Sequence, residues 1–96
     1  MPQISLGLVE VRSYVALIEA IDAMLKAANV KIIQYEKVGG GLVSVCISGD
    51  IGAVRVAIEA GQAVASRISE AKSALIANPN QELFPLLNAN PSVSTL

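Results

Sequence analysis

The sequence predicts an α/β domain whose elements follow one another in the order β-α-β-β-α-β. Two segments with apolar residues at helical spacing alternate with segments rich in β-branched residues, and three consecutive glycines separate the second and third predicted strands. The chain has 96 residues, which suffices for one domain but not for two separate cores. We assign the domain to residues 1–87 and expect a flexible tail over residues 88–96.

The first half of the chain predicts a strand and a helix. Residues 4–11 alternate at first and then become continuously apolar, as in a strand buried on much of both faces. Ser13 is a candidate N-cap for a helix ending near residue 28. Asp22 and Lys26 are spaced for an ion pair on its polar side. Its expected apolar face comprises Leu17, Ile18, Ile21, Met24, Leu25 and Ala28.

A glycine run joins two further predicted strands, residues 30–38 and 42–48, into a hairpin. Gly39, Gly40 and Gly41 permit the positive φ angles that a tight turn requires. In the second of these strands the side chains divide between two faces, with Val43, Val45 and Ile47 on one and Ser44, Cys46 and Ser48 on the other.

The second half of the chain completes the fold. Asp50 is the candidate N-cap of a helix whose apolar stripe is Ile51, Val54, Ile58, Gly61, Ala65 and Ile68. A strand at 73–77, a turn at 78–80 and a short helix at 81–87 follow. This is the order of a ferredoxin-like fold: an antiparallel sheet with both helices on one face, here with a short C-terminal helix. The chain has too few polar residues to make the other face of the sheet very polar.

Composition narrows the possible functions. Hydrophobic residues make up 53% of the chain and charged residues 16%, against about 25% charged in typical domains. We therefore expect much of the surface to face other protein copies. Every apolar run is broken by charge before the roughly 20 residues of a membrane-spanning helix, and no secretory signal is expected. A net charge of −1 and three aromatic residues argue against a nucleic-acid binder.

The chemistry-bearing residues do not form a catalytic or metal-binding set. There is no histidine, the commonest general base and metal ligand. The single cysteine, Cys46, is expected to be buried and inert, which fits a reducing cytosol. The carboxylates are spread over separate elements. The sequence thus predicts a non-enzymatic oligomer with no catalytic residue, no metal and no cofactor.

Five segments, in this order, resemble the bacterial microcompartment shell proteins, the BMC-domain family. They are LGLVEVR at 6–12, VALIEAIDAMLKAANV at 15–30, YEKVGGGLV at 35–43, GDIGAV at 49–54 and AG at 60–61. The likeness extends over residues 4–77. It implies a single-domain member that forms flat homo-hexamers. These would tile, with other shell proteins and around cargo enzymes, into the shell of a carboxysome-like organelle in the bacterial cytoplasm.

The resemblance also implies two sites. The hairpin would meet the six-fold axis and rim a pore for small polar metabolites or anions, lined by Lys37, Gly39, Gly40 and Gly41. Gly40 stands where many relatives have serine, which implies a wider or less selective opening. The hexamer edge would be formed by Lys26, Asn29, Asn78, Pro79 and Asn80. Relatives commonly have Arg-Pro-His at the last three positions, and asparagine lacks the bidentate donors of arginine, so weaker or differently angled edge contacts are expected.

Each of these features also has an ordinary explanation. The glycines suit any tight turn, Lys37 is a strand-end lysine, and Lys26 lies on a solvated helix face. An alternative function stays open on the residues alone: an oligomeric ferredoxin-like module that binds a small molecule, its glycine turn cradling an anion. A six-membered disc with a central hole would favour the shell protein. A dimer or trimer with a stoichiometric ligand would favour the regulatory module.

Overall fold

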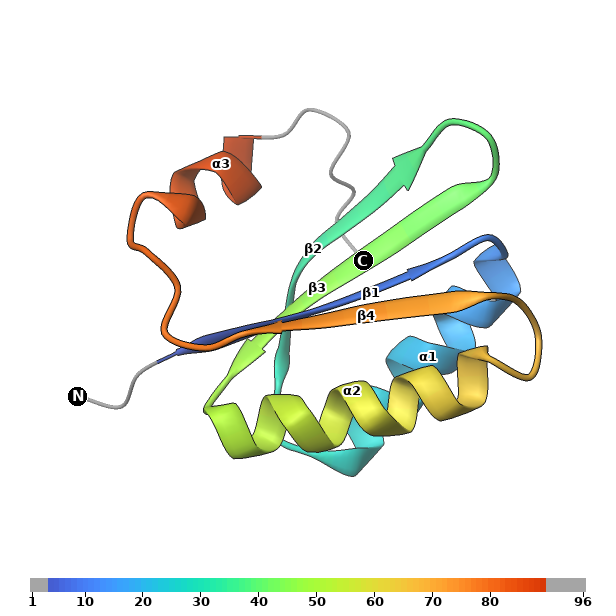
Figure 1. Ribbon diagram of the computed structural model, residues 1–96, viewed down its shortest axis with the longest axis horizontal. Helices are drawn as coiled ribbons and strands as arrows, with labels where there is room; N and C mark the ends of the chain where they lie inside the picture. Colours follow the sequence, from blue (N-terminus) through green and yellow to red (C-terminus); the bar gives the residue numbers. More distant parts are fainter. Residues whose placement is uncertain (1–3, 90–96) are drawn as a thin grey trace.

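The computed structural model describes residues 4–89, and its element order is the predicted one followed by a short helix (Figure 1). The bounds are β1 Ser5–Val11, α1 Tyr14–Ala27, β2 Lys31–Val38, β3 Leu42–Gly49, α2 Ile51–Ala65, β4 Ala71–Ile76 and α3 Leu83–Ala89.

The four strands form one antiparallel sheet in the order β2-β3-β1-β4. Helices α1 and α2 lie side by side on one face, and α3 stands apart from them and contacts β2 (Figure 1). The ferredoxin-like prediction is confirmed in the order of the elements along the chain, the antiparallel sheet and the placement of the two long helices on one face.

The core lies between the sheet and the two long helices. Val9 of β1 pairs with Val45 of β3, and both side chains are buried against the helices. Gly7 brings β1 especially close to α2, because a Cβ there would lie only 2.7 Å from side-chain atoms of Ile58 and Val54. The predicted division of β3 holds: Val43, Val45 and Ile47 belong to this core.

Both predicted helix caps are present. The Ser13 hydroxyl accepts a hydrogen bond from the Ala16 amide at 3.2 Å, and Asp50 Oδ1 accepts one from the Ala53 amide at 2.9 Å. Each satisfies a backbone donor that the first helical turn leaves without an intrahelical partner. The two helices therefore begin where the sequence predicts.

The predicted apolar faces of the helices are partly wrong. In α1, Ile18 is 42% and Leu25 47% exposed, and in α2 Ile51 is also exposed. Ile68 lies beyond the end of α2, in the turn that follows it. The positions buried instead carry small side chains such as Ala16, Ala20 and Ala57. The two helices pack against each other as well as on the sheet, and small side chains permit that close approach.

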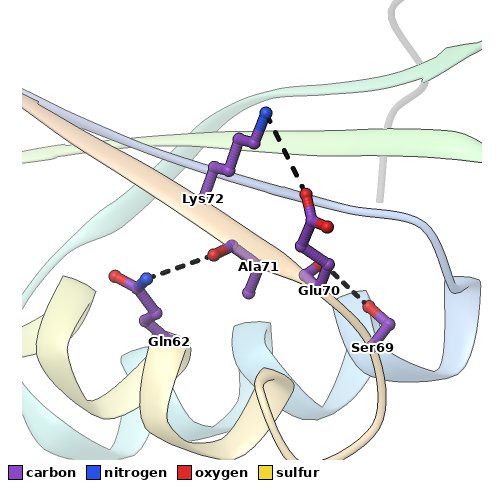
Figure 2. A network of polar contacts seen from close by, with 5 residues as sticks. All are labelled: Gln62, Ser69, Glu70, Ala71 and Lys72. Carbon is purple, nitrogen blue, oxygen red and sulfur yellow. Dashed lines mark hydrogen bonds and ion pairs between the residues drawn. The ribbon is translucent and has the colours of Figure 1, made fainter.

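The fourth strand begins two residues earlier than predicted, at Ala71, because α2 holds it there (Figure 2). Figure 2 shows Gln62 Nε2 donating to the Ala71 carbonyl, at 3.2 Å. The Ser73 hydroxyl also donates to Gln62 Oε1. Figure 2 also shows Lys72 turned away from the helix, with its ammonium 4.0 Å from Glu70. One amide side chain thus anchors the edge strand to the helix layer.

The chain after β4 also differs from its predicted course. The short helix α3 spans Leu83–Ala89 rather than residues 81–87. It therefore includes the first two residues of the expected tail, and residues 90–96 of that tail lie outside the described residues.

The face of the sheet away from α1 and α2 is divided in character. Towards the hairpin, Ser44 of β3 lies between Glu36 of β2 and Glu10 of β1, and Lys72 of β4 is next to Glu10. Towards the other end the register brings Leu6 beside Ile76. Ser48 lies on the other side of Leu6, so this face is mixed in character rather than very polar, as the composition predicts. It contains a hollow of about 250 Å³, lined by Leu8, Glu10, Ser44, Lys72, Ser73 and Ala74.

Candidate functional site

The glycine hairpin forms an exposed tip at one end of the molecule (Figure 1). Gly40 and Gly41 have φ angles of 81° and 82°, in the left-handed region that glycine adopts without strain. A Cβ at Gly39 or Gly40 would meet nothing within 4 Å, and one at Gly41 would meet only the Arg12 carbonyl, at 3.9 Å. The tip therefore presents main-chain groups, with open space around it in the single chain.

Lys37, two residues before the glycines, lies over an aromatic ring. Its Nζ is 5.1 Å from the centre of the Tyr14 ring, within the range of a cation–π contact. Tyr14 in turn meets Tyr35 edge to face, with ring centres 6.1 Å apart and planes at 75°. Sequence analysis missed the part played by Tyr14. The available signals were its place directly after the Ser13 cap and the two-residue spacing of Tyr35 and Lys37 on one strand face.

Tyr35 is the buried base of this arrangement, with only 2% of its surface exposed. Burial, and then the neighbouring Tyr14 side chain, raise the pKa of Tyr35 above its ordinary value. The phenol therefore stays neutral near pH 7, and the aromatic pair provides a fixed, uncharged support beside the hairpin.

The predicted edge residues gather at the opposite end of the sheet. Strand β3 begins at Leu42, directly after the glycines, and ends at Gly49, whose Cβ position is 3.2 Å from the Asn29 carbonyl oxygen. Strand β4 ends beside the same end of β3, because both strands pair with β1, and Asn78 follows it. At about 3.4 Å per residue, a strand of this length separates the two groups by about 24 Å.

Lys26 is prominent at this end. It lies in the last turn of α1, and its Nζ is 2.8 Å from Asp22 Oδ2, which confirms the predicted ion pair. The Lys26 side chain is 77% exposed. The hydrogen bond that Lys26 donates to Asp22, and then the charge of Asp22, raise the pKa of Lys26 above the ordinary value. The ammonium is thus charged at neutral pH and accessible to a neighbouring molecule.

The three residues of the 78–80 turn have different surroundings. Asn78 is exposed and has a φ of 47°, a conformation that asparagine tolerates better than most residues. Pro79 is buried. Asn80 Oδ1 accepts from the Glu82 amide at 2.9 Å, and its carbonyl oxygen accepts from the Leu83 amide at 3.0 Å. In the single chain, Asn78 is therefore the member of this turn whose side chain is available, whereas the Asn80 side chain is bonded within the turn that precedes α3.

Cys46 and its cross-strand neighbour Gln34 lie on the sheet face away from α1 and α2. Cys46 is buried, and burial raises the pKa of its thiol to about 11, so it is inert at neutral pH. Gln34 Nε2 donates to Glu36 Oε2 at 3.3 Å, whereas its buried Oε1 has no partner among the described residues.

Over residues 4–89 no group of three potential ligands is placed to hold a metal ion, and no helix is long and apolar enough to cross a membrane.

Comparison with known proteins decides the family. The model of the BMC domain matches residues 5–79 of the chain. The chain belongs to the BMC-domain family of bacterial microcompartment shell proteins. The resemblance predicted from the five sequence segments is confirmed.

Individual relatives agree with this assignment. Over 88 residues the chain is 46% identical to Bacterial microcompartment shell protein PduA of Salmonella typhimurium, a match that covers 91% of this chain and 94% of that protein. Over 86 residues it is 45% identical to Bacterial microcompartment shell protein EutM of Escherichia coli (strain K12), covering 85% and 89%. Carboxysome shell proteins are also among the relatives.

A solved structure supports the fold. A microcompartments protein from Desulfitobacterium hafniense DCB matches 98% of this chain with a TM-score of 0.81 and 33% identity. This BMC-domain chain spans about half, 52%, of that longer chain. Because the family and the named relatives are structural shell proteins, the prediction of a shell component rather than an enzyme is confirmed.

Proposed function

We propose that this BMC-domain protein forms cyclic homo-hexamers that tile into the facets of a microcompartment shell in the bacterial cytoplasm. Each hexamer would have a central pore for passive diffusion of small polar metabolites. Neighbouring tiles would include other shell proteins, and the shell would enclose cargo enzymes. The observation that carries the proposal is the separation of two candidate sites, the glycine hairpin and the edge residues, at opposite ends of one sheet.

That separation suits a radial arrangement of protomers. If the hairpins of six copies converge on an axis, the opposite ends point outward, where Lys26, Asn29 and Asn78 would meet adjoining hexamers. A six-fold ring is heterologous, so two different surfaces of each protomer must come together. The exposed apolar residues of α1 and the part of the opposite sheet face that stays exposed are two such surfaces.

The hairpin supports passage of small polar or anionic molecules. Gly39, Gly40 and Gly41 would offer only main-chain N–H and C=O groups to the pore, repeated six times. Lys37 would add a ring of positive charge near it. Because all three hairpin positions are glycine, backbone atoms alone would set the width of the opening there.

The assembly is tested by sedimentation and negative-stain electron microscopy of the full chain. A six-membered disc with a central hole is the expected result. A monomer at micromolar concentration, or a dimer or trimer that binds a ligand stoichiometrically, would contradict the hexamer and favour the regulatory module.

The pore is best tested at Gly39. A side chain at Gly40 would also strain the turn, because its φ is 81°, whereas Gly39 combines open space with no positive φ. We expect Gly39→Leu to slow entry of small solutes into reconstituted shells, and Gly39→Ala to have a smaller effect. Equal permeability of wild type and Gly39→Leu would show that the solutes cross elsewhere.

The edge is tested at Lys26. We expect Lys26→Asp to leave hexamers intact and to abolish extended sheets, because the side chain would place a carboxylate where an ammonium contacts the neighbouring tile. Asp22→Asn is the matched control, since it removes the intrahelical ion pair and keeps Lys26. If Lys26→Asp hexamers still tile under the electron microscope, the edge assignment is wrong.

A further inference from the structure

The charges around Lys37 do not account for the position of its side chain. The side chain leaves β2 on the same face as Tyr35, two residues earlier, and reaches the N-terminal end of α1. That end of a helix carries partial positive charge and repels an ammonium. Lys37 forms no ion pair with any residue between 4 and 89. The attractive contact in the structure is the face of the Tyr14 ring, 5.1 Å from Nζ.

Tyr14 can hold Lys37 only if its own ring is held, and the structure provides for this. Tyr14 is about half exposed, so its ring is not fixed by burial alone. Its edge-to-face contact with Tyr35 joins it to a residue that is almost completely buried in the core. The ring is also carried by the first residue of a capped helix, next to Ser13. The buried Tyr35, the Tyr14 ring and the Lys37 ammonium thus lie one upon the next, from the core outward.

We infer that Tyr14 is the positioning residue for Lys37, and that it fixes where the positive charge lies beside the glycine hairpin. The inference rests on the proposed hexamer and pore. It makes Tyr14 the reason that the proposed ring of charge favours small anions over neutral molecules of similar size, because Tyr14 holds the six ammonium groups near the rim. Tyr14 itself contacts no solute and acts through Lys37.

The expected bias is modest for each chain and is repeated around the ring. A cation–π contact at an exposed site favours the seated rotamer by about two- to fivefold. If the rotamers are otherwise equally populated, about four to five of six ammonium groups are seated at once, against about three without the ring. Loss of the ring would therefore spread the charge without removing it.

The contact is tested by NMR on the full chain after reductive methylation with ¹³C-formaldehyde, which keeps the charge of each lysine. The chain has four lysines, Lys26, Lys31, Lys37 and Lys72, and Lys37→Arg identifies the Lys37 signal by its disappearance. We expect a ring-current shift to low frequency for Lys37 in wild type and in Tyr14→Phe. In Tyr14→Leu the signal should move to the position of solvated lysines. An unchanged Lys37 signal in Tyr14→Leu would overturn the inference.

The consequence for selectivity is tested with shells reconstituted around a fluorescent reporter. The entry rates of iodide and of neutral acrylamide are compared, so that leaks affect both probes alike. The ratio of iodide to acrylamide entry should fall in Tyr14→Leu, part of the way to its value in Lys37→Gln. It should stay at the wild-type value in Tyr14→Phe, which keeps the ring and also controls for folding.

The outcomes separate the inference from the proposed pore. If Lys37→Gln lowers the ratio and Tyr14→Leu does not, the pore stands and the role of Tyr14 is wrong. If neither variant changes the ratio although the NMR shift depends on Tyr14, the contact exists but the proposed pore is not the anion route. A fall in Tyr14→Phe equal to that in Tyr14→Leu would show that the hydroxyl, not the ring face, is responsible, and would also overturn the inference.

Discussion

Replacing Gly7 by alanine tests the closest approach between the sheet and α2. The new Cβ would lie 2.7 Å from Ile58 Cδ1 and Val54 Cγ1, and 2.9 Å from Ile58 Cγ1. Both partners are buried and β-branched, so their χ1 angles are restricted in a helix and they cannot easily turn aside. Overpacking of this kind costs about 1–3 kcal/mol. Removing a glycine from a strand interior returns about 0.5–1 kcal/mol. At the middle of these two ranges, the net loss in the free energy of unfolding is about 1 kcal/mol.

The assay is thermal and urea unfolding at one fixed protein concentration, because the stability of an oligomer depends on concentration. A loss of this size lowers Tm by about 4–8 °C in a domain of under 100 residues. Gly52→Ala is the matched control, since its Cβ would meet only Asp50 Oδ1, at 3.5 Å, and Tm should hold or rise.

A double-mutant cycle isolates the cause. Ile58→Val removes the Cδ1 atom that the alanine would touch, at a cost of about 0.5–1.5 kcal/mol on its own. In the Gly7→Ala background this cost should shrink or vanish, giving a favourable coupling of at least about 0.5 kcal/mol. Additive effects, or a Gly7→Ala protein as stable as wild type, would refute the proposed clash.

Three further predictions concern the hairpin, a cap and the thiol. Gly40→Ala should lower the free energy of unfolding by about 1–2 kcal/mol because its φ is 81°, whereas Gly39→Ala should change it little; equal effects in urea unfolding would contradict the turn geometry. Asp50→Ala should cost about 1 kcal/mol through the lost cap on the Ala53 amide, and an unchanged urea midpoint would show that the cap is dispensable. Burial raises the pKa of Cys46 from 9.0 to about 11, so the folded state binds this proton more tightly than the unfolded one. The stability so contributed is complete below pH 9 and is lost between about pH 9 and pH 11; Cys46→Ala should show a shallower fall in urea midpoint over that range, and parallel curves would refute the assignment.

The sequence predicts those features of this fold that depend on local chemistry. Ser13 and Asp50 are caps because a side-chain oxygen can reach a free amide three residues on, and the structure shows both bonds. The glycine turn and the alternation along β3 are likewise properties of neighbouring residues, and both are found. Beginning from such signals, the order and type of all six main elements are predicted correctly.

Features set by contacts between distant residues are predicted less well. The start of β4 is held by hydrogen bonds with Gln62 on α2, a contact that no local pattern indicates. Pro79 lies in the turn that the sequence predicts, but its burial is not indicated by the local pattern. The layering of Tyr35, Tyr14 and Lys37 joins residues from two elements, and only the packing of α1 on the sheet brings them together.

The helix residues that were predicted to be buried but are exposed also bear on function. Periodicity places Ile18 and Leu25 on the apolar face of α1, but within the single chain both side chains are exposed. Its helices use alanines for close packing and leave Tyr14, Val15, Ile18 and Leu25 of α1 exposed. A run of exposed apolar side chains along one helix is typical of an interaction surface. The exposure of these residues and the low charge content therefore lead to the same expectation. Some residues that the sequence pattern places in the core of one chain would be buried only by contact with a second chain.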